Sequence, residues 1–259
     1  MAAPETALIT GASAGIGTEL ARCFARDGSD VVLLARRGSV LRRLADELEA
    51  AYGVTAHVLP ADLSTPRAPE TVATDLKARG IAVDVLVNNA GFGARGPFAD
   101  LDAARQVDMV QVNVTALMQL ARLLLPAMLH RNRGGILNVA STAAFQPGPY
   151  MSVYYASKAF VLSFSEGLAE EVADTNVTVT CLAPGPTETE FFDRANMGDM
   201  KLSENGIAMS ADAVARNGYA AFRNGAVLTI PGTSNQVGAF LTRFLPRALV
   251  RKFAAWLQQ

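Results

Sequence analysis

Tyr154 and Lys158 stand four positions apart, and Ser141 precedes the tyrosine by thirteen positions. If the segment is helical, Tyr154 and Lys158 lie one turn apart on the same face. A lysine ammonium beside a phenol favours the phenolate and lowers the tyrosine pKa from about 10 toward neutrality. Tyr154 could then donate a proton to a carbonyl or accept one from an alcohol. Tyr155 cannot replace it, because it stands only three positions from Lys158.

A glycine-rich turn joins the first predicted strand to the first predicted helix. It reads Thr10-Gly11-Ala12-Ser13-Ala14-Gly15-Ile16-Gly17. Glycines let a backbone approach a pyrophosphate closely, and the free N–H groups of a helix N-terminus attract its negative charge. A strand before the turn and a helix after it are the context that this motif requires. We therefore predict a dinucleotide contact at Gly11, Ser13, Ala14, Gly15, Ile16 and Gly17, with an unliganded turn as the alternative.

The end of the second predicted strand bears on which dinucleotide is bound. An acidic residue there would bind a ribose 2′-hydroxyl, but the strand at 31–35 is followed by Arg36 and Arg37. Two guanidinium groups without a nearby carboxylate suit a 2′-phosphate, and they favour NADP(H) over NAD(H). Arg37, farther from the strand, could instead be a solvated loop residue.

Two further loops after predicted strands could complete the dinucleotide site. Asp62 and Leu63 could read an adenine edge with a carboxylate and a backbone N–H, although Asp62 could equally cap the next helix. The small residues of Asn88-Asn89-Ala90-Gly91 would leave room for the adenine ribose, while an asparagine ties neighbouring strands.

Apolar runs alternate with segments of helical periodicity along the chain. The predicted strands are residues 7–10, 31–35, 55–60, 83–88, 135–141, 178–183 and 227–230. The predicted helices are residues 16–27, 40–52, 69–79, 103–129, 152–173 and 211–224. Strands rich in Val, Leu and Ile without alternation suit a sheet covered on both faces, and strand–helix repetition predicts a doubly wound α/β fold. We expect a single domain over residues 1–259, with an irregular substrate lid at 186–209 and an amphipathic tail at 233–259.

Composition excludes several classes of protein. The 259 residues are 50% hydrophobic and 18% charged, with a formal net charge of −1. No apolar run reaches the length of about 18 residues that predicts a transmembrane helix. Two cysteines and two histidines are scattered, so no metal site is predicted. Thinly spread basic residues without aromatic partners argue against nucleic-acid binding, and the absence of signal-peptide regions favours the cytoplasm.

Together these motifs resemble the short-chain dehydrogenase/reductase family. The resemblance covers residues 6–232 and adds Asn113 and the Pro184-Gly185 pair to the motifs described above. Both the interval from Ser141 to Tyr154 and the glycine spacing are similar to those of the single-domain reductases. Residues 145–147, 158–160 and 244–247 resemble bacterial 3-ketoacyl and broad carbonyl reductases. The resemblance implies a seven-stranded Rossmann fold.

The resemblance also implies a role for each catalytic candidate. Ser141 would hold a substrate oxygen, and Tyr154 would protonate it as hydride arrives from a nicotinamide. Lys158 would depress the tyrosine pKa and bind the nicotinamide ribose. Asn113 would help to connect that lysine to water through its backbone. The alternatives are a strand-end cap for Ser141 and an ordinary polar helix residue for Asn113.

The loop after the sixth predicted strand resembles the family segment that touches the nicotinamide and the phosphates. Pro184, Gly185, Thr187 and Thr189 are its candidate contacts, although the prolines could serve only a stiff turn. Mostly apolar residues would line the substrate pocket and favour a hydrophobic ketone or acyl chain. These candidates are Phe92, Ala143, Phe145, Tyr150 and Phe191.

Two functions remain open. The first is an NADP(H)-dependent oxidoreductase that reduces a ketone or aldehyde, or oxidises the alcohol. The second is a non-catalytic NADP(H)-binding sensor on the same fold. A sensor has no need for the serine, tyrosine and lysine together, so we favour the enzyme; fold alone would not decide.

The fifth predicted helix bears on assembly. Leu117, Leu120, Leu124 and Met128 repeat at helical spacing among further apolar residues. With the family resemblance, they predict a homodimer or homotetramer through paired helices. In the alternative, every apolar residue faces its own sheet.

The tail is basic, because no acidic residue follows Asp212. Leu249, Val250, Phe253 and Leu257 recur at helical intervals after Pro246. Such a segment could lie on an anionic membrane surface. Docking on the protein itself, near the cleft or a subunit neighbour, is the interpretation that we favour.

Overall fold

A seven-stranded parallel sheet lies at the centre of the computed structural model, which describes residues 4–190, 208–242 and 244–257. Its strands are β1 (Thr6–Thr10), β2 (Asp30–Ala35), β3 (Ala56–Pro60), β4 (Val85–Asn88), β5 (Gly134–Val139), β6 (Val177–Leu182) and β9 (Leu228–Thr229). Their order across the sheet is β3-β2-β1-β4-β5-β6-β9. Every predicted strand is present, with ends that differ by one or two residues from the sequence expectation.

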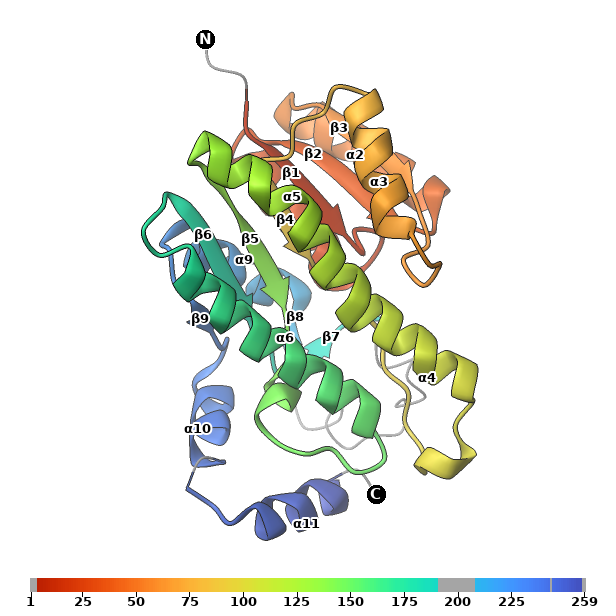
Figure 1. Ribbon diagram of the computed structural model, residues 1–259, viewed down its shortest axis with the longest axis vertical. Coiled ribbons are helices and arrows are strands. Elements are labelled where there is room, and N and C mark those ends of the chain that lie inside the picture. The colour runs from red at the N-terminus through yellow and green to blue at the C-terminus, as the bar shows by residue number, and fades with distance from the viewer. Residues whose placement is uncertain (1–3, 191–207, 243, 258–259) are drawn as a thin grey trace.

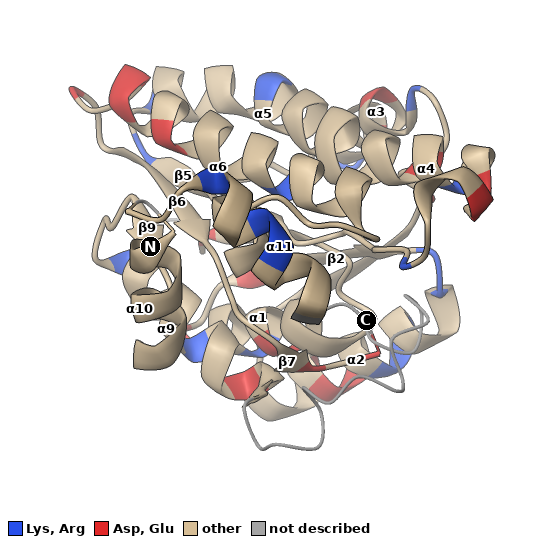
Figure 2. Ribbon diagram, turned by 90° about the horizontal axis from the view of Figure 1, so that it is seen from below, with Lys and Arg blue, Asp and Glu red and all other residues tan. Residues whose placement is uncertain are grey.

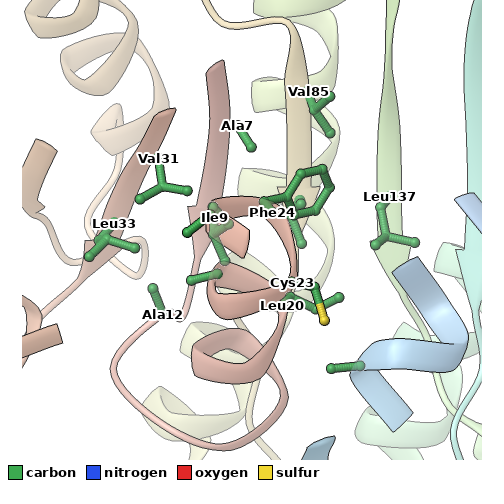
Figure 3. Packing of buried hydrophobic residues seen from close by; sticks show 14 of the residues in the cluster. Ala7, Ile9, Ala12, Leu20, Cys23, Phe24, Val31, Leu33, Val85 and Leu137 are labelled. Atoms are coloured by element: carbon green, nitrogen blue, oxygen red, sulfur yellow. The ribbon is translucent and has the colours of Figure 1, made fainter. Parts of the chain in front are cut away.

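Helices cover both faces of this sheet (Figure 1). One face carries α1 (Gly15–Arg26), α2 (Gly38–Tyr52) and α9 (Ala211–Arg223); the other carries α3 (Ala68–Ala78), α5 (Leu117–Arg131) and α6 (Ser152–Glu171). Successive strand residues point to opposite faces, so Ile9 belongs to the first core and Leu8 to the second. In Figure 3, Leu20, Cys23 and Phe24 of α1 pack toward the sheet. The predicted doubly wound Rossmann-type fold is confirmed.

The long helical run before β5 contains an irregularity that the sequence did not predict. It comprises α4 (Ala103–Val110), a π-helical turn η2 (Gln111–Ala116) and α5. A π-turn inserts one extra residue into a helix and is frequent at functional sites. The run Ala103–Arg131 is long and apolar enough to cross a membrane by length and composition. It is the one such helix among the residues that the structure describes, and α5 contributes Leu120 and Met128 to the core beneath it, so this is weak evidence for a membrane span.

The remaining elements lie around the carboxyl ends of the strands. They are η1 (Phe98–Asp100), η3 (Thr142–Phe145), β7 (Thr187–Glu188), β8 (Met209–Ser210), α10 (Thr233–Leu241) and α11 (Arg247–Leu257). β7 pairs in parallel with β8 and brackets residues 191–207. Most of the lid predicted at residues 186–209, including Phe191, lies outside the described residues.

Candidate active site

The topology brings two loops together where the chain changes direction across the sheet. β1 lies between β2 and β4, and open α/β sheets bind ligands at such a switch point, outside the carboxyl ends of the strands. The Thr10 hydroxyl donates to Val87 O (3.2 Å) and accepts from the backbone N–H groups of Asn89 (2.9 Å) and Ala90 (3.0 Å). Asn89 Nδ2 donates to Thr10 O at 2.9 Å. These bonds hold the glycine-rich turn against the loop after β4.

Neighbouring atoms approach the backbone of that turn so closely that three of its positions have no room for a side chain, which explains why they are glycines. Gly11 has a φ of +67°, and a Cβ there would lie 2.7 Å from Asn89 Nδ2. A Cβ on Gly17 would lie 2.4 Å from Gly11 O, and one on Gly15 would lie 2.7 Å from Thr189 Cγ2. The N-cap residue of α1, Ala14, supplies no side-chain cap, so the first N–H groups of α1 remain for a ligand at the cleft.

The two arginines after β2 both line the cleft but have different surroundings. Arg37 Nη2 donates to Ser13 O at 2.8 Å and forms an ion pair with Glu190 Oε2 at 3.0 Å. Arg36 Nη1 lies 4.0 Å from Asp62 Oδ2, and its side chain is 67% exposed. The expectation that no carboxylate is near was wrong, because the fold brings both acids from distant parts of the chain. Arg36 remains the more accessible guanidinium, whereas Arg37 helps to hold the turn.

Asp62 and Asn88 each have a defined structural task. Asp62 Oδ1 accepts from Ser64 N (3.0 Å) and Ser64 Oγ (2.8 Å). Because α3 begins at Ala68, with Arg67 as its N-cap, Asp62 does not cap that helix. Asp62 and Leu63 both line the cleft. Asn88 Nδ2 donates to Asn138 Oδ1 at 2.9 Å and thereby ties β4 to β5.

The tyrosine, lysine and serine meet at the opposite end of the same cleft. Tyr154 and Lys158 are buried on α6, and Lys158 Nζ lies 5.8 Å from the centre of the Tyr154 ring. Lys158 Nζ donates to Val139 O at 2.8 Å. Ser141 follows β5; its hydroxyl accepts from Ala143 N at 3.1 Å and is hydrogen-bonded to the side chain of Tyr154. Ser141 is thus both the cap of η3 and a neighbour of the phenol.

Burial shifts the two titratable groups in opposite directions. It raises the pKa of Tyr154 well above the ordinary value for a phenol, although the hydrogen bond with Ser141 opposes this shift. It lowers the pKa of Lys158 to about 8. The expectation that the tyrosine pKa is depressed is therefore not met, because burial disfavours the charged phenolate and the hydrogen bond with Ser141 only partly opposes this effect. A neutral phenol beside a lysine that is charged below pH 8 is the form suited to proton donation.

Asn113, at the π-turn, connects the loop after β4 to α6 through side-chain hydrogen bonds. Its Oδ1 accepts from Phe92 N at 3.1 Å, and its Nδ2 donates to Phe92 O at 3.0 Å and to Ser157 Oγ at 3.1 Å. Ser157 Oγ in turn donates to Tyr154 O at 2.6 Å. A Cβ on Gly91 would lie 3.1 Å from Asn113 Oδ1 and 3.5 Å from Lys158 Nζ, so this loop packs tightly against both side chains.

A cleft of about 740 Å³ connects the glycine turn to this cluster. Its far end is lined by Phe92, Arg105, Asp108, Ala143, Gln146, Met151 and Tyr155. Two expected lining residues lie elsewhere: Phe145 packs against Ala140 and Val161, and Tyr150 is not part of the lining. Because η3 turns the chain, Ala143 and Phe145 point in different directions. The sequence analysis missed Arg105, Asp108, Gln146, Met151 and Tyr155. For the last three, their adjacency to the catalytic motifs was the only signal.

The loop after β6 closes one side of the cleft. Pro184, Gly185, Thr187 and Thr189 all line it. Pro184 O accepts from Thr142 N at 2.9 Å, which fixes the loop beside Ser141. A Cβ on Gly185 would lie 2.3 Å from Asn235 Oδ1 of α10, so the tail begins in contact with this loop.

The fold and the cleft define a nucleotide-dependent α/β oxidoreductase. Residues 5–199 match the sequence profile of the short chain dehydrogenases. The protein belongs to the short-chain dehydrogenase/reductase family, and its fold binds a nicotinamide cofactor.

Three relatives illustrate the range of this family. The NADP-dependent 3-hydroxy acid dehydrogenase of Schizosaccharomyces pombe is 35% identical over 203 residues, which are 78% of each chain. A short-chain dehydrogenase from Sphingobium yanoikuyae, solved in complex with NADPH, is 33% identical, with a TM-score of 0.83 over 93% of both chains. A family member from Burkholderia phymatum, solved with NAD, is 27% identical, with a TM-score of 0.81 over 92% of both chains.

Proposed function

We propose that the protein reduces a ketone or aldehyde of a hydrophobic substrate, or oxidises the corresponding alcohol, with NADP(H) as cofactor and Tyr154 as acid and base. The observation that carries this proposal is the meeting of Ser141, Tyr154 and Lys158 at one end of a cleft whose other end is the glycine-rich turn. A non-catalytic sensor would need the end with the glycine-rich turn, but not the cluster of Ser141, Tyr154 and Lys158.

The residues at the turn fit a dinucleotide. Gly11 and Gly17 leave no room for a Cβ, and the uncapped N-terminus of α1 offers N–H groups to a pyrophosphate. Arg36 stands at the end of β2, where a 2′-phosphate would lie. The relatives that use NADP(H) support this choice, and the NAD complex shows that the family alone does not decide it. Ser13, Leu63, Ala90 and Thr189 would complete the contacts along the cleft.

Each side chain of the cluster has a separate task in the proposed reaction. A bound nicotinamide supplies or accepts the hydride. Ser141 would donate a hydrogen bond to the substrate oxygen, and Tyr154 would transfer its proton there as negative charge develops. Lys158, charged below pH 8, would stabilise the resulting phenolate. Asn113 would hold the loop at Gly91 and Phe92 against this cluster.

The lining of the far end indicates the class of substrate. Phe92, Ala143 and Met151 present apolar surface there, which suits an aliphatic or aromatic carbonyl compound. Arg105 and Asp108 add one positive and one negative charge at the edge of this surface. A neutral hydrophobic ketone therefore fits the lining better than a highly charged sugar phosphate does.

A substrate panel tests the proposal. Purified protein is mixed with NADPH and aliphatic, aromatic and 3-oxoester carbonyl compounds, and the loss of NADPH absorbance is followed. Turnover of at least one hydrophobic ketone, abolished by Ser141→Ala, is expected. Tight NADPH binding without turnover of any compound, unchanged by Ser141→Ala, would instead support the sensor.

A further inference from the structure

The two helices of the tail expose an unusual amount of apolar surface. Eight of the seventeen large apolar side chains that are exposed among the described residues lie between positions 237 and 256. We expected the tail to dock on protein, yet within the described part of α11, residues 247–256, the buried side chains are Val250 and Ala254, both small or medium in size. Isolated exposed apolar residues need no explanation, but a contiguous group marks an interaction site.

Helical spacing places these side chains on continuous faces. Val237, Phe240, Leu241 and Phe244 follow the i, i+3, i+4, i+7 pattern along α10 and just beyond it, and the rings of Phe240 and Phe244 lie 4.9 Å apart. On α11, Leu249, Phe253 and Trp256 share a face, and the last two rings stack at 5.9 Å. Trp256 is 69% exposed and is the only tryptophan of the chain.

The charge of this segment is entirely positive. Arg247, Arg251 and Lys252 are exposed on α11, and no acidic residue follows Asp212 in the sequence. Lys252 stands three positions after Leu249 and four before Trp256, so it borders the apolar face. Figure 2 shows the basic segments of α11 on the side of the molecule seen from below. Basic residues combined with exposed aromatic rings are the pattern of a helix that lies in a membrane interface.

A second copy of the chain fits this surface less well. A two-fold contact through the tail would bring Arg247, Arg251 and Lys252 of one copy toward the same residues of the other, without acidic residues from either tail to offset them. Anionic phospholipid headgroups offset this charge, and the acyl chain boundary accepts phenylalanine and tryptophan rings.

We propose that α10 and α11 dock the protein reversibly on an anionic phospholipid surface. Figure 1 shows both helices at the end of the molecule toward which the sheet strands point, the end that also holds the cleft. Docking would turn this end toward the bilayer. The proposal concerns an interaction surface and does not depend on the reaction assigned to the cleft.

Trp256 provides a direct readout in the protein without any substitution. Vesicles of phosphatidylcholine with and without phosphatidylglycerol are added, and the emission maximum and co-sedimentation are measured. A blue shift and pelleting with the anionic vesicles, both reduced in roughly 1 M salt where charges are screened within about 3 Å, are expected. No shift and no pelleting with anionic vesicles would overturn the proposal.

Matched variants distinguish vesicle binding by the tail from binding by exposed aromatic rings elsewhere on the protein. Leu249→Ser with Phe253→Ser keeps Trp256 and should weaken vesicle binding about tenfold or more, because two apolar contacts are lost. Lys252→Glu should weaken binding to anionic vesicles only. Phe98→Ser removes a ring that is 67% exposed outside the tail and should bind as the parent protein does.

Thermal unfolding and NADPH binding check that each variant is folded. Equal vesicle binding by the parent and by the Leu249→Ser, Phe253→Ser variant would refute the proposal. A Trp256 emission maximum that depends on protein concentration without vesicles, together with a dimer lost in that variant, would assign the surface to a second copy instead.

Discussion

Tyr154 and Lys158 share one face of α6, and burial favours the uncharged form of both side chains. The protonation state of each group matters, because the direction of proton transfer depends on which form is populated. The high pKa of Tyr154 keeps the phenol protonated at neutral pH, ready for carbonyl reduction. Lys158, with a pKa of about 8, changes its charge within the working range of an enzyme assay.

Removing the hydroxyl of Tyr154 tests the proton donor. Tyr154→Phe should lower kcat by about two to four orders of magnitude, the usual contribution of a positioned acid–base group, with NADPH binding nearly unchanged. Tyr155→Phe is the matched control, because this residue also lines the cleft but stands elsewhere on the helix. Similar losses in both variants would show that the acid is assigned to the wrong residue.

The pKa of Lys158 predicts a pH dependence. Below about pH 8 the amine is protonated and can stabilise the phenolate; as pH rises through 8 this charge is lost, so kcat/KM for reduction should fall. The chain has four lysines, which allows the titration of each to be followed by carbon-13 NMR of labelled side chains. One resonance, absent from Lys158→Met, should titrate near 8. Four resonances near the ordinary value of about 10.4 would contradict this prediction.

Cofactor selectivity is also argued from a single side chain. Arg36→Ala should raise KM for NADPH about tenfold or more and leave KM for NADH nearly unchanged, because one charge-assisted contact to a 2′-phosphate is lost. Arg43→Ala, an exposed arginine on α2, is the control. A parent protein with equal affinity for the two cofactors would show that Arg36 does not select NADP(H).

At the scale of elements, the π-turn η2 decides where Asn113 points. An uninterrupted α-helix over 103–131 would rotate every following residue relative to the preceding turn. The extra residue of the π-turn accompanies the three side-chain hydrogen bonds that Asn113 makes to Phe92 and Ser157. One helix irregularity thus joins three elements that surround the cleft.

Asn113→Ala tests this junction. Two partly buried backbone groups of Phe92 and the buried hydroxyl of Ser157 would lose their partner, so the free energy of unfolding should fall by about 1–3 kcal/mol in urea titrations. Gln119→Met on the neighbouring α5 is the control, because its Oε1 has no hydrogen-bond partner within the described parts of the chain. That substitution should be neutral or slightly stabilising. Equal destabilisation by both changes would argue against the proposed junction.

At the scale of the whole molecule, the apolar residues of α5 divide between two surfaces. Leu117, Leu120 and Met128 of the predicted stripe are buried within the subunit, and Leu124 is half-buried. These four residues therefore face the core of their own subunit. Other apolar side chains, Met118, Leu123 and Leu129, are exposed on α5, and Phe160 is exposed on α6 over the same face of the sheet.

These exposed residues support the proposal that the protein forms a homodimer or homotetramer through α5 and α6. Light scattering at micromolar concentration should give a multiple of 27.3 kDa, and Leu123→Glu with Phe160→Glu should give monomers. Tyr52→Glu places the same charge on an exposed aromatic position of α2 and should leave the assembly intact. A monomeric parent protein would refute this proposal.

The sequence alone determined the order and type of the seven sheet strands and of the helices between them, together with the dinucleotide turn. These features are local: apolar runs set the strands, helical periodicity sets the helices, and Gly11, Gly15 and Gly17 follow a strand within one short segment. The spacing of Tyr154 and Lys158 likewise depends only on helix geometry. The family resemblance added Ser141 and Asn113, which stand far from that pair in the chain.

Tertiary structure decided what depends on distant neighbours. Glu190 reaches Arg37 and Asp62 approaches Arg36 only after folding, and the π-turn that orients Asn113 leaves no sequence pattern that we recognised. Burial, rather than the four-residue spacing, sets the protonation of Tyr154 and Lys158. Exposure of Phe253 and Trp256 could not be predicted either, since an amphipathic pattern fixes which residues share a face but not what covers it.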